Sequence, residues 1–264
     1  MILEVDQGNT RFKWRVRAGD DQIVAFGSEL NSEIGNLSWL RQLEAVLAGR
    51  ALQSVAVGSV AKVSYQQDLL DLCRQHLAIE PMLMTAEREF VWGNSRLLNS
   101  YADVKRMGVD RWAAMVAAVC EWPGDVLVVA DAGTAINVEV IAPGGEHVGG
   151  YIAPGLQMMQ SSLLTNTGAI VMGAEARERR QQPGTNTAEA VGHGVFNAGL
   201  GLIERAHNYA LGRWRESTIT LILTGGDALV LHEALTQAQL RPDLVLDGLK
   251  HMLRAHQCIG STGE

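Results

Sequence analysis

The sequence predicts an α/β fold built from two similar halves. Each half contains three consecutive strands followed by alternating helices and strands. Each half also begins with the same kind of turn, in which an apolar strand ends in aspartate and a glycine with an Asn or Thr follows. The two turns, at Asp6 and Asp131, lie close to half the chain length apart. Internal similarity at this spacing indicates a duplicated domain and not a short-period solenoid.

Composition excludes several classes of protein. The 264 residues are enough for two small domains or one large domain. With 47% hydrophobic and 19% charged residues, the chain is not a disordered protein, a coiled coil or a disulfide-stapled mini-protein. A formal net charge of −7 provides no basic excess, so we expect no nucleic-acid partner. Local phosphate sites are still allowed, because backbone N–H groups bind phosphate without net positive charge.

The cysteines and the N-terminus predict a cytoplasmic protein. Cys73, Cys120 and Cys258 are odd in number and far apart, without the spacing of a zinc site. The N-terminal sequence MILEVD does not resemble a signal peptide. No apolar run approaches the roughly 18 residues that a membrane span requires, so we expect no membrane contact.

In the first half, a strict alternation marks the second strand. Phe12, Trp14 and Val16 fall on one face between basic residues at 11, 13, 15 and 17, which is the period of a half-buried strand. Other short apolar runs predict strands over residues 2–6, 23–26, 52–57 and 81–84. Helical periodicity predicts helices over residues 37–47, 64–76 and 110–121. The halves meet near Pro123, so the predicted domains are residues 1–122 and 123–264.

The second half repeats this order. Apolar runs predict strands over residues 126–130, 135–141, 147–152, 219–223 and 244–246. Helices are expected over residues 154–164, 187–211 and 228–235, with a final helix after residue 246. The polar stretch 173–186 is either a solvated connection or a loop that borders a ligand or a partner chain.

The two Asp-x-Gly turns favour phosphate binding. A tight glycine turn lets backbone N–H groups approach a phosphate, and an aspartate at a strand end can hold a hard cation. Either turn alone is explained by turn chemistry, because Asp and Asn beside Gly commonly build turns. Two such turns in matching places could grip one polyphosphate, which favours the phosphate interpretation.

A third glycine-rich turn follows the strand expected over residues 219–223. Its sequence, Thr224-Gly225-Gly226-Asp227, allows a ligand to lie against the backbone at a helix N-terminus. Alternatively, Asp227 serves only as the N-cap of that helix. The chain contains no Walker-type motif and no dinucleotide-binding glycine motif after a strand.

Six motifs follow one another along the chain. They are Asp6-x-Gly8-Asn9-Thr10, Gly108-Val109-Asp110-Arg111-Trp112, Asp131-Ala132-Gly133-Thr134-Ala135, GGYIAPG at 149–155, TAEA at 187–190 and TGGD at 224–227. Together they resemble the type III pantothenate kinases over nearly the whole chain. The resemblance implies duplicated ribonuclease-H-like domains of the actin-like ATPase fold, with a nucleotide cleft between them. It also implies ATP-dependent phosphorylation of pantothenate to 4'-phosphopantothenate, the first step of coenzyme A biosynthesis.

The resemblance also implies roles for individual residues. Asp110 would be catalytic, Asp131 would bind a monovalent cation (K⁺ or NH₄⁺), and Asp6 is a candidate Mg²⁺ ligand. The phosphates of ATP would meet Asp6, Gly8, Asn9, Thr10, Lys13, Gly133, Thr134, Gly225 and Gly226. Pantothenate would meet Tyr101, Gly108, Val109, Asp110, Arg111 and Thr187. The active form in this family is a homodimer, in which the partner protomer helps to build the pantothenate site.

Four of the six substrate-site residues also have a structural alternative. Asp110 can orient the attacking hydroxyl and accept its proton, or it can cap a helix. The guanidinium of Arg111 suits the carboxylate of pantothenate, or it forms a surface ion pair. Tyr101 and Thr187 can hydrogen-bond the substrate, or they are a half-buried tyrosine and a helix cap.

The chain departs from the family pattern at one position. Asn137 stands where that pattern places a hydroxyl residue, so contacts to a cation or a phosphate could differ. Two other functions are compatible with the fold: a non-catalytic regulatory or accessory protein of the same family, and a kinase for a sugar or acetate. The complete catalytic set favours an enzyme, and the short chain lacks room for the insertions of larger sugar kinases.

Overall fold

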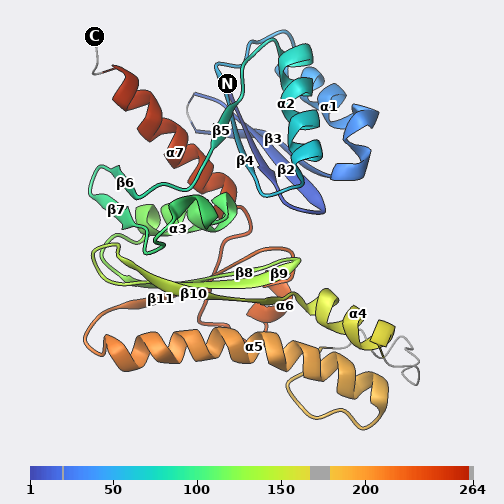
Figure 1. Ribbon diagram of the computed structural model, residues 1–264, viewed down its shortest axis with the longest axis vertical. Coiled ribbons are helices and arrows are strands. Elements are labelled where there is room, and N and C mark those ends of the chain that lie inside the picture. Colours follow the sequence, from blue (N-terminus) through green and yellow to red (C-terminus); the bar gives the residue numbers. More distant parts are fainter. Residues whose placement is uncertain (20, 167–178, 262–264) are drawn as a thin grey trace. The chain divides into compact units, whose positions relative to one another are not determined.

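The computed structural model describes residues 1–19, 21–166 and 179–261 (Figure 1). Contacts divide the chain into two compact units. The first unit comprises Met1–Ser95, Tyr101–Cys120 and Leu244–Glu264, and the second comprises Arg96–Ser100 and Glu121–Asp243. The C-terminal segment thus groups with the first unit, although it lies at the far end of the chain. A domain division between residues 122 and 123 stays a prediction.

The first unit contains a five-stranded sheet in the order β3-β2-β1-β4-β5. Its strands are β1 (Ile2–Gln7), β2 (Arg11–Arg17), β3 (Ile23–Leu30), β4 (Ser54–Ser59) and β5 (Met82–Met84). The first three run antiparallel, and β4 and β5 are parallel to β1. The helices of this unit are η1 (Asn31–Asn36), α1 (Ser38–Leu47), α2 (Val63–Leu77), η2 (Val104–Arg106), α3 (Val109–Glu121) and α7 (Leu244–Ser261).

The two faces of the first sheet are buried in different ways. Phe12 and Trp14 point into an apolar core shared with α1 and α2, where Trp39 packs edge-on against Phe12 at 5.6 Å between ring centroids. The alternate residues carry charge, yet Arg15 is only 1% exposed. Helix α7 contacts β1, β4 and β5 on this charged face. The predicted alternation is therefore confirmed, but its basic face is covered by a helix and not by water.

A buried ion-pair network explains why α7 belongs to the first unit. Arg15 donates to Glu4 at 2.6 Å and to Asp247 of α7 at 3.0 Å. Arg17 donates to the same two carboxylates at 3.1 and 3.2 Å. Burial raises the pKa of Glu4, although both guanidiniums oppose that shift. Charges buried in this way require their partners, so the network fixes α7 on the sheet.

The second unit repeats the topology of the first. Its sheet has the order β10-β9-β8-β11-β12, again three antiparallel strands and then two parallel ones. The strands are β8 (Val126–Ala132), β9 (Ala135–Ile141), β10 (His147–Pro154), β11 (Ile219–Thr224) and β12 (Gln239–Leu240). The helices are α4 (Leu156–Asn166), α5 (Thr187–Arg213) and α6 (Ala228–His232). The matching orders confirm the predicted fold class of duplicated ribonuclease-H-like domains.

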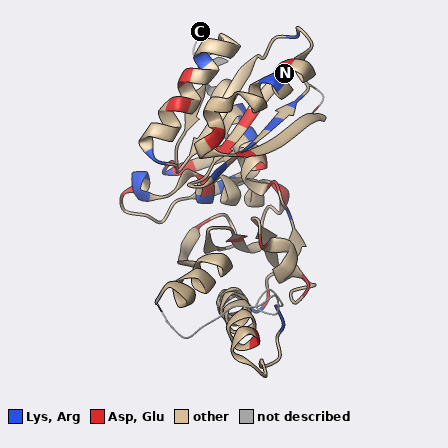
Figure 2. Ribbon diagram, turned by 90° about the vertical axis from the view of Figure 1, so that its right-hand side faces the viewer, with Lys and Arg blue, Asp and Glu red and all other residues tan. Residues whose placement is uncertain are grey.

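Helix α5 forms the main cover of the second sheet. It contacts β8, β9, β11 and α4, and its apolar residues share a core with these strands. Helix α4 contains no charged residue, and Figure 2 shows few charged residues on the helices of this unit. Across the ranges that the structure describes, no helix is both long enough and apolar enough to span a membrane.

One predicted strand is wrong. Residues 244–246 form the first turn of α7, and the edge of the second sheet is the short strand β12. All three residues are buried, and a short apolar run of this kind does not distinguish a strand from a buried helix. The helix expected over residues 228–235 ends earlier, at His232. The hairpin of β6 (Glu89–Trp92) and β7 (Ser95–Leu98) was not predicted.

Candidate active site

The first phosphate turn joins β1 to β2. Gly8 N closes it by donating a 2.9 Å hydrogen bond to the carbonyl at the start of β2. Asn9 and Thr10 are exposed at its tip. Asp6 and Lys13 stand opposite each other on the β1–β2 ladder. Residues opposite each other in a ladder share a face, so a carboxylate and an ammonium group flank the turn, and all five predicted residues lie together.

Two buried polar side chains hold this turn, and neither is among the residues that the sequence predicts for the site. Asn31 donates from Nδ2 to Gly8 O at 2.8 Å and from its backbone N to Thr10 O at 3.0 Å. Gln7 Nε2 donates to Asn31 Oδ1 at 3.3 Å, and Ser59 Oγ donates to Gln7 Oε1 at 2.8 Å. Gln7 and Asn31 are 0% and 1% exposed. No local signal marks Asn31, because only the folded sheet brings it to the turn.

Asp110 lies in the first turn of α3, one residue inside the helix. The cap position belongs to Gly108, whose carbonyl accepts a hydrogen bond from Trp112 N at 3.1 Å. The Asp110 carboxylate instead accepts from Arg111 N at 2.8 Å. A side chain at position 108 would overlap Asp110 Oδ1 and touch a methyl of Val60. The geometry does not support N-capping as the role of Asp110, and it explains why glycine precedes this turn.

Arg111 and Tyr101 form a pair beside Asp110. Arg111 Nη1 donates to Tyr101 Oη at 2.9 Å, and its Cζ lies 5.4 Å from the centre of the tyrosine ring. Arg111 is only 6% exposed, so it is not a surface ion pair. Arg88, another residue absent from the predicted site, donates to the carbonyls of Tyr101 and Ala102 at 2.8 and 2.9 Å. The first unit therefore gathers a carboxylate, a guanidinium and a phenol around the start of α3.

The second phosphate turn joins β8 to β9. Gly133 N donates to Ala135 O at 2.9 Å, and Thr134 is exposed at the tip. Gly155 N donates to Thr134 O at 2.9 Å, and a side chain at position 155 would overlap the turn. The proline-glycine end of the GGYIAPG motif thus packs directly against the turn.

Glycine 225 brings the third turn against Asp131. Its φ is +94°, a value that favours glycine, and a Cβ there would overlap Asp131 Oδ1 and Ala132 O. Asp227 N donates to Ala132 O at 2.9 Å, which ties the two turns together. The Asp227 side chain makes no capping hydrogen bond and accepts instead from Arg179 Nη1 at 3.1 Å. The predicted residues Asp131, Gly133, Thr134, Gly225 and Gly226 therefore meet at the carboxyl ends of β8 and β11.

Asn137 lies directly opposite Asp131 on the β8–β9 ladder. Both side chains therefore point to the same face of the sheet, and both are partly exposed. The position at which the chain departs from the family pattern is thus adjacent to the predicted cation ligand.

Thr187 is the first residue of α5. The helix cap is Asn186, whose side chain accepts from Glu189 N at 3.0 Å. Glu189 in turn accepts from the backbone N and the hydroxyl of Thr185, at 2.7 and 2.9 Å. These hydrogen bonds lower the pKa of Glu189, and the bond from the backbone N of Thr185 has the largest effect. Capping is therefore supplied by Asn186, and the Thr187 side chain is available for another role.

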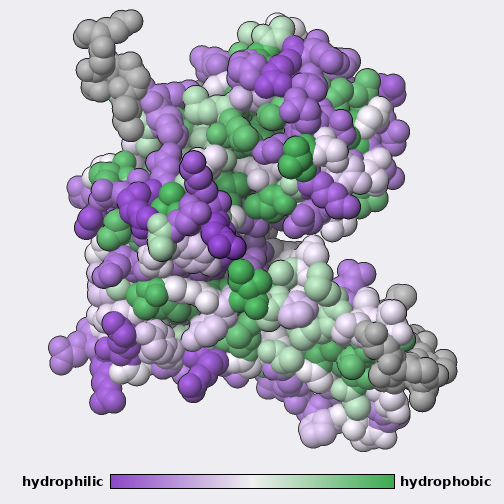
Figure 3. Space-filling model, in the orientation of Figure 1, coloured by the Kyte–Doolittle hydropathy of each residue, from purple (hydrophilic) through white to green (hydrophobic). Residues whose placement is uncertain are grey.

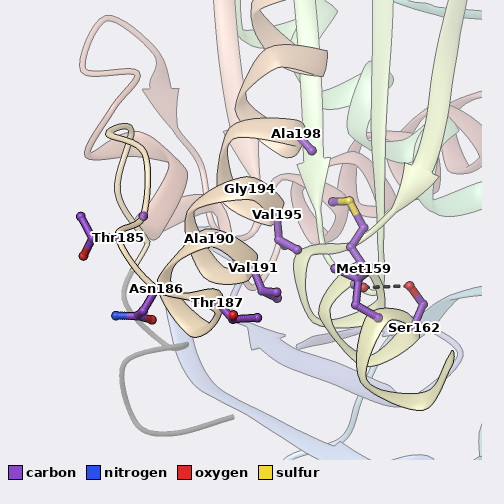
Figure 4. Close-up of a pocket in the computed structure, with 12 residues that line it drawn as sticks. Met159, Ser162, Thr185, Asn186, Thr187, Ala190, Val191, Gly194, Val195 and Ala198 are labelled. Carbon is purple, nitrogen blue, oxygen red and sulfur yellow. Dashed lines mark hydrogen bonds between the residues drawn. The ribbon is translucent and has the colours of Figure 1, made fainter. Parts of the chain in front are cut away.

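Thr187 lines an open pocket of about 700 Å³ between α4 and α5. Figure 4 shows Val191, Val195 and Ala198 of α5 facing Met159 of α4, with Thr187 at the end of the pocket. The lining is largely apolar and includes residues 184–186 of the polar stretch. Residues 173–178 of that stretch lie outside the described residues. The prediction that the stretch is a solvated connection, or a loop that borders a ligand or a partner chain, therefore concerns residues that are described only in part.

The carboxylates of Asp6 and Asp131 can be compared with what Mg²⁺ and a monovalent cation require of their ligands. In the described parts of the chain, no group of three or more His, Cys, Asp and Glu side chains could hold a metal ion. A magnesium ion that arrives with polyphosphate needs only one or two carboxylates, and Asp6 beside the first turn fits this requirement. Asp131, cradled by the backbone at Gly225, offers the hard oxygen that a monovalent cation prefers. The residues present therefore fit both ions.

The repeated sheets, each with a glycine turn at the end of its first strand, define the actin-like ATPase and sugar-kinase fold. Two solved structures share this fold over most of the chain. One is a protein from Sinorhizobium meliloti provisionally assigned as a 2-dehydro-3-deoxygalactonokinase, with a TM-score of 0.54, 14% identity, and coverage of 98% of this chain and 99% of that one. The other is the activator of 2-hydroxyisocaproyl-CoA dehydratase from Clostridium difficile with bound ADPNP, with a TM-score of 0.54, 12% identity, and coverage of 98% and 97%. At such low identity these similarities establish the fold alone.

Sequence comparison narrows this class to one family. A model of the type III pantothenate kinases matches residues 2–208. A type III pantothenate kinase from Pseudomonas putida is 35% identical over 258 residues, covering 94% of this chain and 97% of the relative. Another from Marinobacter nauticus is 35% identical over 261 residues, covering 97% and 99%. The chain belongs to the type III pantothenate kinase family.

Proposed function

We propose that the protein transfers the γ-phosphoryl group of ATP to pantothenate and so forms 4'-phosphopantothenate for coenzyme A biosynthesis. One observation carries the proposal: a chain of this family keeps both glycine turns with their aspartates, together with the Asp110, Arg111 and Tyr101 cluster. Phosphoryl transfer depends mainly on positioning and charge neutralisation, and these elements supply both.

In this proposal the residues of the first unit act on the hydroxyl and the phosphates. The backbone N–H groups around Gly8, with Asn9, Thr10 and Lys13, bind phosphate oxygens. Asp110 orients the attacking hydroxyl of pantothenate and accepts its proton as the new P–O bond forms. Arg111 binds the pantothenate carboxylate, and its bond to Tyr101 fixes the direction of the guanidinium. Gly108 and Val109 form the adjacent backbone of the substrate site.

The residues of the second unit contribute phosphate and cation contacts. Gly133, Thr134, Gly225 and Gly226 offer backbone and hydroxyl donors to ATP. Asp131 would hold a monovalent cation, K⁺ or NH₄⁺, and Asp6 would help to hold the Mg²⁺ that accompanies ATP. Each ion supplies positive charge against the phosphates. Asn137, which faces the same side of the sheet as Asp131, would offer the cation a neutral amide oxygen.

A homodimer completes the pantothenate site in this proposal. The open α4–α5 pocket is apolar, contains Thr187, and is flanked by exposed Met158, Leu163 and Leu164. Figure 3 shows hydrophobic surface where Figure 1 draws α4 and the adjacent part of α5. An apolar patch of this kind marks an interaction surface. A second copy would cover it and bring Thr187 to the substrate. The absence of nucleic-acid and membrane partners and the cytoplasmic location stay predictions from the sequence.

The proposal is tested by identifying the product. The purified protein is incubated with ATP, Mg²⁺, K⁺ and pantothenate, and the mixture is analysed by mass spectrometry. We expect 4'-phosphopantothenate to accumulate, while parallel reactions with galactose or acetate give no phosphorylated product. Phosphorylation of neither pantothenate nor these alternatives would favour the accessory-protein function.

A further inference from the structure

A serine, a histidine and a glutamate form a continuous hydrogen-bonded chain in the second unit. Ser100 Oγ lies 2.9 Å from His147 Nδ1, and His147 Nε2 lies 2.9 Å from Glu139 Oε2. His147 and Glu139 are 1% and 2% exposed, whereas Ser100 is exposed. None of the three belongs to the phosphate turns or to the predicted pantothenate site.

The chemistry of the three groups sets the direction of the hydrogen bonds. An ionised glutamate only accepts hydrogen bonds, so Nε2 of His147 carries the hydrogen. In the tautomer with its hydrogen on Nε2, His147 presents the lone pair of Nδ1 to Ser100, whose hydroxyl donates. Serine is activated as a nucleophile when its hydroxyl is hydrogen-bonded to a base and a carboxylate orients that base.

The backbone around the three residues holds them in place. Gly150 stands opposite Glu139 on the β9–β10 ladder, and a side chain there would occupy the space of the Glu139 carboxylate. The segment before Ser100 is anchored by the β9–β10 turn, because Leu98 N donates to Gly145 O at 2.8 Å. Both ends of the hydrogen-bonded chain are therefore fixed by main-chain contacts.

Ser100 and His147 line a pocket of about 380 Å³ that also contains Arg213 and Trp214. The Arg213 Cζ lies 5.1 Å from the centre of the Trp214 indole ring, and its Nη1 donates to Tyr209 Oη at 3.0 Å. These contacts orient the guanidinium. Besides the exposed Glu146, the lining combines a nucleophile, a cation and a flat apolar surface. The Arg213 guanidinium suits a small substrate with an anionic group.

We propose that Ser100, His147 and Glu139 form a second reactive site, at which Ser100 accepts the acyl group of a small carboxylic ester that bears an anionic group. Ser100 Oγ attacks the ester carbonyl carbon while its proton passes to His147 Nδ1. The alcohol then leaves and takes that proton. Water next attacks the carbonyl carbon of the acyl-serine and gives a proton to His147 Nδ1. The bond between Oγ and the acyl carbon then breaks, the proton returns from Nδ1 to Oγ, and the carboxylic acid leaves. Glu139 acts as a positioning residue that stabilises the charged imidazole.

A fluorophosphonate probe tests the nucleophile directly. Attack forms an Oγ–P bond and expels fluoride, and peptide mapping by mass spectrometry locates the adduct. We expect Ser100 to react about 100-fold faster than Ser38, since general-base assistance is typically of that size. Ser38 is the matched internal control, because its hydroxyl donates to Glu29 at 2.5 Å without a histidine. Ser100→Ala should remove the adduct.

Variants of the other residues separate reactivity from structure. Glu139→Gln keeps the size of the side chain but removes its charge and should slow labelling about tenfold, with partial rescue in Glu139→Asp. Arg213→Gln should lower the hydrolysis of 4-nitrophenyl succinate monoester by a larger factor than that of 4-nitrophenyl acetate, because only the succinate ester carries an anionic group. Circular dichroism and the thermal midpoint check the fold of each variant. Equal labelling of Ser100 and Ser38 in the unmodified protein, or unchanged labelling in a folded Glu139→Gln variant, would overturn the proposal.

Discussion

At the scale of single residues, the first phosphate turn depends on a buried asparagine that does not belong to it. Asn31 binds the turn through two hydrogen bonds to main-chain carbonyls. Asn31→Ala removes the side-chain bond and leaves Gly8 O without this donor. We expect the KM for ATP to rise several-fold, because the N–H groups of a looser turn no longer converge on the phosphates. Steady-state kinetics with varied ATP measures the effect.

The matched control for this prediction is Asn36→Ala. Asn36 lies at the other end of η1 and is exposed. It should leave the KM for ATP unchanged. Equal effects of the two substitutions would show that Asn31 acts through general stability and not through the turn.

Arg111 allows a test of substrate recognition. Lysine keeps the charge but lacks the planar fork that holds a carboxylate and reaches Tyr101. We expect Arg111→Lys to raise the KM for pantothenate about tenfold or more while the KM for ATP changes little. Arg106→Lys, at an exposed arginine in the same segment, is the control. An unchanged KM for pantothenate in Arg111→Lys would remove this residue from the substrate site.

The sequence predicts the reactive residues of the site better than it predicts the residues that hold them in place. Asp6, Asp110 and Asp131 stand in motifs that are contiguous in sequence, so their types and order are visible before folding. Gln7, Asn31 and Arg88 act through contacts to distant backbone atoms, which no local pattern encodes. Asp110 illustrates the intermediate case. Its position near a helix start was predicted, but only the structure shows that Gly108 takes the cap position.

At the scale of elements, α7 gives a prediction about acid stability. Burial lowers the pKa of His251 on this helix from its ordinary value of 6.5 to about 4. Its Nδ1 is buried and has no hydrogen-bond partner among the described residues. Below pH 6.5 the unfolded chain binds a proton at this position and the folded chain does not, so stability falls as the pH drops from about 6.5 towards 4.

Replacing His251 should remove this part of the pH dependence. We expect the thermal midpoint of His251→Gln to fall less than that of the unmodified protein between pH 7 and pH 4.5. His256→Gln is the control, because His256 lies on the same helix, is exposed, and pairs with Glu87 at 2.9 Å. Parallel pH curves for the protein and His251→Gln would contradict the assignment.

Helix α7 also shows where element prediction fails. Its first turn, residues 244–246, is an apolar run that suits a strand locally. These residues are helical because α7 packs on the charged face of the first sheet, where Asp247 pairs with Arg15. A contact between residues near opposite ends of the chain leaves no periodic signal. By contrast, the strands β2 and β9 alternate so regularly that their predicted ends agree with the structure.

At the scale of the whole molecule, duplication was visible in the sequence because both halves keep the same turn after the same apolar strand. The assembly requires experiment. If a second copy covers the α4–α5 pocket, Leu163→Glu on α4 should convert a dimer to a monomer, since it places a charge in an apolar interface. Sedimentation velocity measures the change.

Leu229→Glu is the control for the assembly, because Leu229 is more exposed than Leu163, at 63% against 38%, and lies on α6. It should leave the dimer intact. A monomeric unmodified protein with full activity would contradict the proposed completion of the site by a partner.

Asp110 is proposed to assist this chain in the phosphorylation of pantothenate. The most direct test is a coupled assay of ADP release with and without pantothenate, run in K⁺ on the unmodified protein and on Asp110→Asn. We expect pantothenate-dependent ADP release that falls about 100-fold or more in a folded Asp110→Asn variant that still binds ATP. Near-normal turnover in Asp110→Asn, or no dependence on pantothenate in the unmodified protein, would contradict it.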